Sequence, residues 1–474
     1  MWVLPATSAE KKPLYRQIME LIEDSIANGM LNAGDRLPSE RQLGELLDVN
    51  RSTVINALDK LADRGVLIRK TGSGTFVNPE NWGLQSYPVL NWSPPAHGRT
   101  GPDDYAMRVE ALRKKSILEH KPLLDLASGS ITPDLLPVQT FPELSWYNLC
   151  AQEQDAENAM LGLYSFRLAV QRHLQRKLNL QVDLEQILIT SGAQQALFLI
   201  SQALLKPGDI IGVEAPSYFY LLPIFQASGL RLCALPVDEE GVIPGKLSQL
   251  AEKNQLKMIF INPVFQNPTG YVMGEERKKN LLQFCRRKHI PIVEDDAYSL
   301  LSFNPQTDIT PLKKYDRQQQ VIYIGSLSKY IGNNIRAGWL IAPKAIINKL
   351  ASIRQKIDFG LSALPQLLAE HYLLNHIDRH TLQLQTRLAQ RAERLTSWLA
   401  QRYPGEFSVR QPLGGLYLYA RFTAPDPAKK FARLLNDLLD EDIIVARGSD
   451  FGDKAAAIRL NYAHFVLPDA APPI

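Results

Sequence analysis

The feature that most constrains the fold is an alternation of short apolar runs with amphipathic stretches, which begins near residue 124. Five runs have the length of single strands: QILIT (186–190), IIGVEA (210–215), MIFINP (258–263), IPIVEDD (290–296) and VIYIGS (321–326). Strands that are apolar on both faces are typical of parallel sheets covered by helices. The pattern therefore predicts a large α/β domain over residues 124–474 with a mainly parallel central sheet.

Residues 11–78 show a second pattern, in which three helical segments are followed by a short hairpin. Ser39 and Gln42 have the spacing of a capping box at the start of the second segment, and Asn50 is suited to cap the third. The positions expected to be buried are Leu43, Leu46 and Leu47 in the second segment and Val54, Ala57, Leu58 and Leu61 in the third. Residues 79–123 are rich in Pro and Gly with weak periodicity, which favours a linker with room for one helix.

The second and third segments have the arrangement of a helix-turn-helix. Arg51, Ser52, Thr53 and Asn56 lie opposite the apolar stripe of the third segment, where they could reach base edges and phosphates. A solvated helix face is the other explanation of this pattern. Residues 1–80 carry 10 Lys or Arg and 11 Asp or Glu, so the case for DNA binding rests on local placement rather than on bulk charge.

The segment GDRLPSERQLGELLDVNRSTVINALDKLADRGVLIRKTGSGTFV closely resembles the winged-helix domain of GntR-type bacterial transcription regulators, and the resemblance extends from Tyr15 to Val77. It implies binding of double-stranded operator DNA, with Arg41 and Arg51 as the main contacts. The predicted DNA-binding set is completed by Asn50, Ser52, Thr53, Asn56, Gly72, Ser73 and Gly74. One departure is Ile55, at which some members of the family carry another basic residue.

Lys329 follows the last of the five strand candidates and precedes a glycine-punctuated loop that contains Arg336. A lysine that binds an aldehyde cofactor covalently needs a phosphate cradle, a carboxylate for a ring nitrogen, donors for a ring oxygen and an aromatic ring to stack on. Candidates at predicted strand ends are Gly192, Ala193 and Gln194 for the cradle, Asp295 as the carboxylate, Asn267 as a donor, Tyr218 as the ring, and Ser326 with Arg336 for a phosphate. Taken singly, each has an ordinary structural explanation, such as a core ring for Tyr218.

The set SGAQQAL, PSY, NPTG, EDDAY, SLSKYIGNNIRAG and RLNY resembles, in its order and spacing, the fold-type I aminotransferases related to aromatic and 2-aminoadipate aminotransferases. The resemblance implies pyridoxal 5′-phosphate held as a Schiff base on Lys329. It also implies that Asp295 pairs with the pyridine nitrogen, and that Arg459 grips a ligand α-carboxylate in a bidentate fork. The other implied contacts are Asn267 and Tyr298 with the ring hydroxyl, Tyr218 on the ring face, and Ser191, Gly192, Ala193, Gln194, Ser326 and Arg336 with the phosphate.

One segment departs from the aminotransferase pattern. Residues 157–162 read ENAMLG where related sequences usually read YGDPRG. By the resemblance, Glu157 stands where related sequences have the tyrosine that reaches the cofactor of a neighbouring subunit, which weakens one phosphate contact and bears on transaminase turnover more than on cofactor binding.

The fusion of these two domains resembles the MocR subfamily of GntR-type regulators. The resemblance implies a regulator that senses an amine, an amino acid or the cofactor itself through its internal aldimine. It also implies a head-to-tail homodimer in which the DNA reader of one chain packs over the large domain of the other. Two alternatives remain open at this point, namely a working aminotransferase with a DNA-binding appendage and a repressor whose large domain is only a dimerisation scaffold.

Composition bears on location rather than on mechanism. No apolar run reaches the length of a transmembrane helix, and the first residues lack the basic start and apolar stretch of a signal peptide. The three cysteines, at positions 150, 233 and 285, are far apart in sequence, which indicates neither a metal site nor a disulfide framework. We therefore expect a bacterial cytoplasmic protein with no membrane partner and no bound metal.

Overall fold

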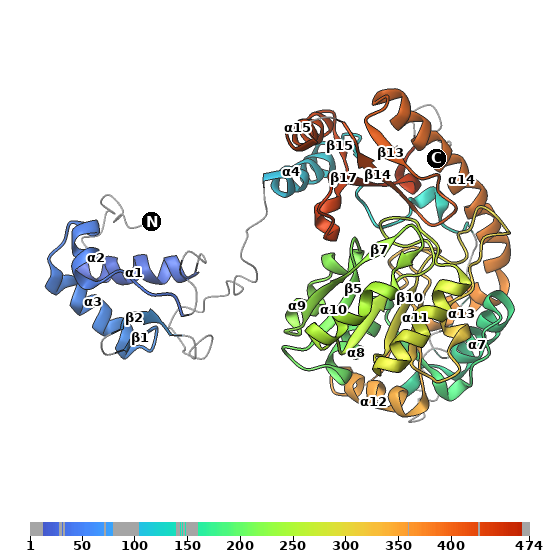
Figure 1. The fold of residues 1–474 in the computed structure, drawn as a ribbon, viewed down its shortest axis with the longest axis horizontal. Coiled ribbons are helices and arrows are strands. Elements are labelled where there is room, and N and C mark those ends of the chain that lie inside the picture. The colour runs from blue at the N-terminus through green and yellow to red at the C-terminus, as the bar shows by residue number, and fades with distance from the viewer. Residues whose placement is uncertain are drawn as a thin grey trace. The chain divides into compact units, whose positions relative to one another are not determined.

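The computed structural model describes residues 13–27, 31, 34–70, 73–78, 104–138, 143, 145, 147, 160–358, 360–424 and 427–466. They fall into two compact units, within Met1–Met107 and Arg108–Ile474, whose helices and strands are labelled in Figure 1. In the part of the chain so described, no helix is both long enough and apolar enough to cross a membrane.

The N-terminal unit contains three helices and a two-stranded antiparallel hairpin, as the sequence predicts. The elements are α1 (Leu14–Ala27), α2 (Glu40–Leu47), α3 (Arg51–Asp63), β1 (Leu67–Lys70) and β2 (Gly74–Val77). The predicted capping box is present, because Ser39 accepts from the Gln42 amide and the Gln42 side chain accepts from the Ser39 amide. Asn50 caps α3 by accepting from the Ser52 amide at 3.0 Å.

One predicted core position of this unit is wrong. Leu46 has 53% of its surface exposed, whereas Leu43, Gly44 and Leu47 are the buried residues of α2. Gly44 faces the start of α3, where an added Cβ would lie 3.2 Å from the Val49 carbonyl oxygen. This close approach turns the buried face of the short helix toward Gly44 and away from Leu46, because Gly44 and Leu46 lie about 160° apart around a helix of 3.6 residues per turn.

The large unit is built on a seven-stranded sheet in which every neighbouring pair is parallel except the two pairs that contain β12. Its strands, in spatial order, are β4 (Ile187–Thr190), β12 (Gly338–Ile341), β11 (Val321–Ser326), β10 (Ile292–Asp296), β9 (Met258–Ile261), β5 (Ile210–Glu214) and β6 (Arg231–Leu235). The five strands predicted from apolar runs are all present. The edge strand β6 and the antiparallel strand β12 were not predicted.

Helices cover both faces of this sheet, and successive strand residues enter two different cores. Met258 and Phe260 of β9 join one cluster with α8 and α12, whereas Ile259 and Ile261 join the other with α10 and α11. This two-residue alternation explains why both faces of the strand are apolar. The helices of this layer are α7 (Tyr164–Leu178), α8 (Ala193–Leu204), α9 (Pro223–Ala227), α10 (Leu247–Asn254), α11 (Glu275–Lys288), α12 (Lys344–Gln355) and α13 (Ala363–Asn375).

A second, four-stranded antiparallel sheet defines what we call the C-terminal lobe of the large unit. Its strands are β13 (Phe407–Val409), β14 (Tyr417–Phe422), β17 (Ala457–Asn461) and β16 (Ala446–Arg447). The same lobe carries α15 (Pro427–Asp440) and the parallel pair of β15 (Ile443–Ile444) with β3 (Leu124–Asp125). The large unit also contains the long helix α14 (Ile377–Arg402) and a small hairpin of β7 (Val237–Asp238) and β8 (Gly241–Val242).

The predicted linker, residues 79–123, contains helix α4 (Asp104–Glu119), and residues 79–103 lie outside the described part of the chain. Arg108 donates to Asn436 and to Asp440 of α15, each at 2.6 Å, and Arg113 donates to Asp125 at 2.8 Å. Figure 1 shows α4 beside α15. The helix is therefore attached to the C-terminal lobe.

Candidate functional site

The sheet edge at which the parallel strands end gathers most of the predicted site residues. β4 ends next to Ser191, β10 ends one residue after Asp295, and β11 ends at Ser326. Arg336 lies two residues before the start of β12, which runs antiparallel to β11 and so begins at the same edge. Segments far apart in the sequence are thus brought together at the position where open α/β sheets bind ligands.

Ser191, Gly192 and Arg336 form an anion-compatible corner at this edge. Arg336 Nη2 donates to the Ser191 carbonyl at 2.9 Å, and a Cβ on Gly192 would lie 3.1 Å from the same nitrogen. Gly192 has a φ of 81°, a left-handed conformation that favours glycine. Ala193 and Gln194 follow as the first turn of α8, which begins without a capping side chain. A guanidinium beside an uncapped helix start suits a phosphate.

Lys329 and Asp295 lie close enough for the lysine charge to act on the carboxylate. Lys329 Nζ donates to the Gly129 carbonyl at 2.6 Å, and Ser326 makes its hydrogen bond to Ser328 within the intervening loop. Asp295 is 3% exposed, and burial raises the pKa of its carboxyl to about 6 despite a hydrogen bond from Tyr218. The other carboxylate oxygen, Oδ1, is buried without a hydrogen-bond partner among the described residues.

Tyr218 lies beside the predicted carboxylate, Asp295. Its hydroxyl donates to Asp295 Oδ2, and stacking of its ring on a cofactor stays a prediction. The residue begins a short turn, Tyr218–Leu221, after the end of β5. Tyr218 and Asp295 therefore share one site, as the sequence predicts, through a contact that the sequence did not reveal.

Asn267, Tyr298 and Arg459 are joined by hydrogen bonds. Asn267 Nδ2 donates to the Tyr298 hydroxyl at 3.4 Å, and Arg459 Nη1 donates to Asn267 Oδ1 at 3.1 Å. Arg459 Nη2 donates to the Ala127 carbonyl at 2.5 Å, while Nε has no partner among the described residues. The arginine is 4% exposed, and no described carboxylate forms an ion pair with it. A buried guanidinium bonded only to neutral acceptors is suited to an anionic ligand.

Two aromatic rings flank this arginine. Its guanidinium carbon lies 4.3 Å from the ring centre of Tyr417 and 4.8 Å from that of Phe451. Neither ring was predicted as part of the site. The signal that could have found Tyr417 is strand pairing, since GGLYLYARF and IRLNY are both strand-like and β14 pairs with β17 in the structure.

A buried carboxyl supports the loop that presents Asn267. Glu214 accepts from the Asn262 amide at 3.1 Å, from Gln266 at 3.3 Å and from the Tyr271 hydroxyl. Asn262 in turn accepts from the Asn267 amide at 2.8 Å. Burial raises the pKa of Glu214 to about 7, although these three hydrogen bonds lower it. Glu214 was not predicted, because a glutamate at a strand end has no distinctive sequence signal.

The predicted DNA-binding residues of the N-terminal unit lie on an exposed face. Arg41 and Arg51 have 81% and 65% of their side-chain surface exposed and line a groove of about 1140 Å³ with Arg36 and Gly74. Ser52, Asn56 and Ser73 are exposed, Thr53 is half-buried, and Asn50 is engaged as a helix cap. Gly72 and Glu157 lie outside the described residues.

Acidic neighbours form ion pairs with the basic side chains of this groove. Glu40 accepts from Arg51 at 3.1 Å and lies 3.4 Å from Arg69, and Arg41 pairs with Glu45 at 3.0 Å. Exposed pairs of this kind are worth about 0–1 kcal/mol, so they orient the arginines without holding them firmly.

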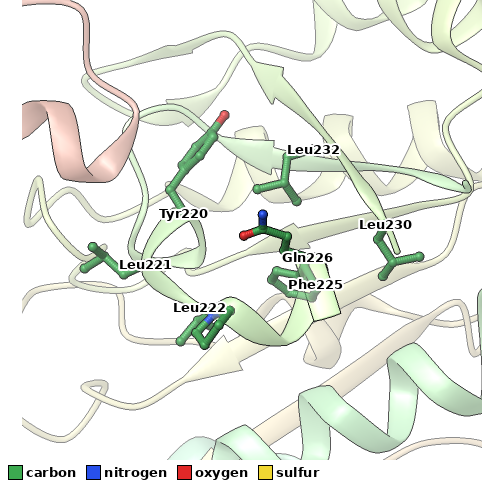
Figure 2. A pocket seen from close by; sticks show the side chains of 8 residues that line it. Tyr220, Leu221, Leu222, Phe225, Gln226, Leu230 and Leu232 are labelled. Atoms are coloured by element: carbon green, nitrogen blue, oxygen red, sulfur yellow. The ribbon is translucent and has the colours of Figure 1, made fainter. Parts of the chain in front are cut away.

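A separate apolar hollow of about 340 Å³ lies beside the edge strand β6 (Figure 2). It is lined by Tyr220, Leu221, Leu222, Pro223, Phe225, Gln226, Leu230 and Leu232. None of these residues belongs to the predicted site, and the hollow contributes no charged group.

Two protein families match the chain, and together they account for both units. Residues 14–77 match the bacterial regulatory proteins of the gntR family, and residues 124–465 match aminotransferase class I and II. An HTH-type transcriptional regulator of Bacillus subtilis, YisV, described as uncharacterized, is 35% identical over 96% of this chain and 93% of its own. The HTH-type transcriptional regulator NorG of Staphylococcus aureus is 30% identical over 90% of this chain and 95% of its own.

Among solved structures, the large unit resembles aminotransferases. An archaeal alanine:glyoxylate aminotransferase has a TM-score of 0.65 and 27% identity, over 75% of this chain and 90% of its own. The α-aminoadipate aminotransferase LysN of Thermus thermophilus has a TM-score of 0.62 and 26% identity, over 76% of this chain and 91% of its own.

These observations define a winged-helix DNA-binding unit fused to a fold-type I aminotransferase unit. The chain belongs to the GntR-type transcription regulators that carry a class I and II aminotransferase domain, the MocR type. The aminotransferase family to which its large unit belongs is generally dependent on pyridoxal 5′-phosphate.

Proposed function

We propose that this protein regulates transcription in response to a small molecule that its large unit recognises with pyridoxal 5′-phosphate. The observation that carries the proposal is the buried Oδ1 of Asp295, which has no hydrogen-bond partner among the described residues and lies at the same sheet edge as Lys329. A buried carboxylate oxygen without a partner is costly, and a protonated ring nitrogen is the kind of donor that would satisfy it.

The remaining residues fit the other parts of the cofactor. Ser191, Gly192 and Arg336 would hold the phosphate, with Ala193, Gln194 and Ser326 around them, and Asn267 with Tyr298 would hold the ring hydroxyl. Tyr218 would release Asp295 and lie against the ring. When bound, the cofactor supplies an aldehyde carbon that the amine of Lys329 holds reversibly and that a ligand amine can take over.

Arg459 would select the ligand. Its guanidinium is buried and lacks an anionic partner among the described residues, so a carboxylate would supply the charge that the site lacks. An amine that also bears a carboxylate, such as an amino acid, fits both Lys329 and Arg459. The cofactor alone is the second candidate effector, because it would occupy the site without using Arg459.

Coupling to DNA requires that the ligand favour one arrangement of the protein over another. The groove with Arg41 and Arg51 would contact operator DNA in the cytoplasm. A homodimer would present two such grooves, which suits paired half-sites. A head-to-tail dimer, with each reader over the partner's large unit, would bring the ligand site and the reader into one assembly.

The experiment that tests this proposal is the substitution Lys329→Ala in the full chain. We expect loss of borohydride-stable labelling by pyridoxal 5′-phosphate and of visible absorption, with DNA binding retained and its response to amino acids lost. Lys344→Ala, on the same unit but 61% exposed and paired with Glu185, is the matched control that should label normally. Labelling of another lysine in the unsubstituted protein, or an unchanged response in Lys329→Ala, would overturn the proposal.

A working aminotransferase is the second candidate, and the intact set of Lys329, Asp295 and Arg459 favours it. Turnover of purified protein with amino acids and 2-oxoglutarate distinguishes the two. Sustained product formation at many equivalents of enzyme supports the enzyme, whereas a single spectral change that follows ligand concentration supports the sensor.

A further inference from the structure

Tyr417 occupies the position at which three predicted site groups meet. It lies on β14 of the C-terminal lobe and is 3% exposed. Its ring is the nearer of the two that flank Arg459, at 4.3 Å, and its hydroxyl accepts from the Tyr298 hydroxyl at 3.3 Å. One side chain therefore contacts the ligand-binding arginine and the tyrosine predicted to hold the ring hydroxyl.

The Tyr417 hydroxyl and the Lys329 amine both lie near Gly129. A Cβ built on Gly129 would lie 3.7 Å from the Tyr417 hydroxyl oxygen and 4.0 Å from Lys329 Nζ, so the two atoms border the same small space. Gly129 is itself tied to Lys329, because its carbonyl accepts from Nζ at 2.6 Å. Because Gly129 has no side chain, no Cβ occupies the space that these two atoms border.

The groups that act on Tyr417 come from several elements. Lys329 follows β11, Arg459 lies on β17, Tyr298 follows β10, and Tyr462 lies just beyond β17. Burial raises the pKa of the Tyr417 hydroxyl, but the charges of Lys329 and Arg459 and the hydrogen bond from Tyr298 outweigh it, so the pKa is lowered from its ordinary value. The buried tyrosines Tyr218, Tyr298, Tyr323 and Tyr462 all have raised pKa values.

We propose that Tyr417 couples the carboxylate site at Arg459 to the amine chemistry at Lys329, because its ring holds the guanidinium and its hydroxyl exchanges a proton with the amine beside it. This role rests on the function proposed above. The exchange is a proton transfer alone: the tyrosinate oxygen takes a proton from an ammonium group and leaves a neutral amine with its lone pair free.

The direction of the coupling follows from charge. A ligand carboxylate on Arg459 cancels one of the two positive charges that favour the tyrosinate. The proton affinity of the Tyr417 tyrosinate then rises when a carboxylate arrives, and the tyrosinate oxygen takes a proton from the ammonium group of the same ligand, which leaves a neutral tyrosine and a neutral amine. An amine ligand without a carboxylate does not offset the charge of Arg459, so it does not raise the proton affinity of Tyr417.

The first test uses the cofactor-free full chain and follows tyrosinate formation by ultraviolet difference absorbance against pH. We expect the first tyrosine to ionise to be missing in Tyr417→Phe and to shift to higher pH in Arg459→Met. Tyr419→Phe is the matched control on the same strand, because Tyr419 donates to Asp453 at 2.7 Å and its pKa is raised. An unchanged early transition in Tyr417→Phe overturns the inference.

The second test measures exchange on the cofactor-loaded protein by absorbance, with alanine and with ethylamine as ligands. Tyr417→Phe keeps the ring on Arg459, so we expect cofactor stoichiometry to stay normal while exchange with alanine slows on the order of a hundredfold. The preference for alanine over ethylamine should fall by the same factor, and the pH dependence of the rate should lose one ionisation.

A third variant tests the shared space without touching either functional group. Gly129→Ala places a methyl group in ordinary contact with both atoms, and we expect slower exchange with normal tyrosinate titration. Equal rates in Tyr417→Phe and the unsubstituted protein reject the role of the hydroxyl. Failure of cofactor labelling in the unsubstituted protein instead rejects the proposed function, and the cofactor-free titration still reports on Tyr417.

Discussion

At the scale of single residues, the ligand edge of the sheet is dominated by buried carboxyls. Burial raises the pKa of Glu214 to about 7, of Glu294 to about 8 and of Asp295 to about 6. Glu294 accepts from the Leu312 and Lys313 amides at 2.6 and 2.8 Å, and Glu214 has three donors, so both have structural partners. Asp295 differs from them because one of its oxygens has none among the described residues.

This difference gives a prediction for stability without cofactor. The pKa of Asp295 is raised from 3.8 to about 6 in the folded chain, so folding favours its protonated form. Its stabilising contribution is present below about pH 4 and is lost as the pH rises through 6. Two pKa units correspond to about 3 kcal/mol, so Asp295→Asn should be more stable than the unsubstituted chain by that order above pH 6 and similar to it at pH 4.

Denaturant unfolding of the two cofactor-free proteins between pH 4 and 8 measures this difference, since the other buried carboxyls are common to both. Saturation with pyridoxal 5′-phosphate should reverse the order, because only the carboxylate can pair with a protonated ring nitrogen. Parallel pH profiles for the two cofactor-free proteins would contradict the assignment of the raised pKa to Asp295.

At the scale of elements, helix α3 carries the predicted DNA contacts and depends on one cap. The Asn50 side chain accepts from both the amide and the hydroxyl of Ser52 at 3.0 Å. Asn50 therefore acts in this structure by fixing the start of α3, and Ser52 is partly occupied by the same bond. We expect Asn50 to contribute to DNA binding by keeping Arg51, the first residue of the helix, in place.

We expect Asn50→Ala to destabilise the N-terminal unit by about 1 kcal/mol, because it leaves the Ser52 amide without its partner. Hydrogen–deuterium exchange of α3 peptides in the full chain should accelerate about fivefold. Asn50→Ser, which retains a capping oxygen, should exchange at nearly the original rate. Equal protection in Asn50→Ala would mean that tertiary packing alone fixes this helix end.

The elements predicted from sequence and those missed differ in how their signal arises. The five predicted strands, which are buried, and the caps at Ser39 and Asn50 are local patterns that can be predicted from adjacent residues. Both β6 and β12 contain short apolar runs, LCAL and GWLI, that were not predicted as strands. The side chains of the edge strand β6 are mostly exposed, whereas those of β12 are buried. Leu46 was misplaced because the burial of α2 depends on how closely Gly44 meets α3.

The candidate site shows the same limit. Motif order located Lys329, Asp295, Asn267 and Arg459. In the structure Lys329 and Asp295 lie near each other at the edge of the large sheet, and Arg459 of the C-terminal lobe is hydrogen-bonded to Asn267. Tyr417, Phe451 and Gly129 could not be found in this way, since their positions depend on the pairing of β14 with β17 and on the close approach of two loops.

At the scale of the whole molecule, the predicted DNA-binding residues and the predicted cofactor-binding residues lie in separate units. Mutation should therefore affect DNA binding and cofactor binding independently. We expect Arg51→Ala to weaken binding to a DNA fragment selected by the unsubstituted protein by about 1–3 kcal/mol if the arginine contacts a base. Cofactor absorption should not change, because Arg51 lies in the N-terminal unit.

Fluorescence anisotropy at several salt concentrations measures this effect and separates base from phosphate contact, since loss of a phosphate contact lowers the salt slope by about one unit. Arg64→Ala, at the far end of the same helix and 3.4 Å from Glu23, is the matched control. Unchanged affinity and salt slope in Arg51→Ala would show that α3 does not lie against the DNA as proposed.

Arg108 attaches α4, the helix of the predicted linker, to α15 of the C-terminal lobe. Arg459 lies on β17 of the same lobe, so α4 and the proposed ligand-binding arginine are carried by one part of the large unit. A rotation of that lobe on ligand binding would therefore also move α4, the helix that the predicted linker contains.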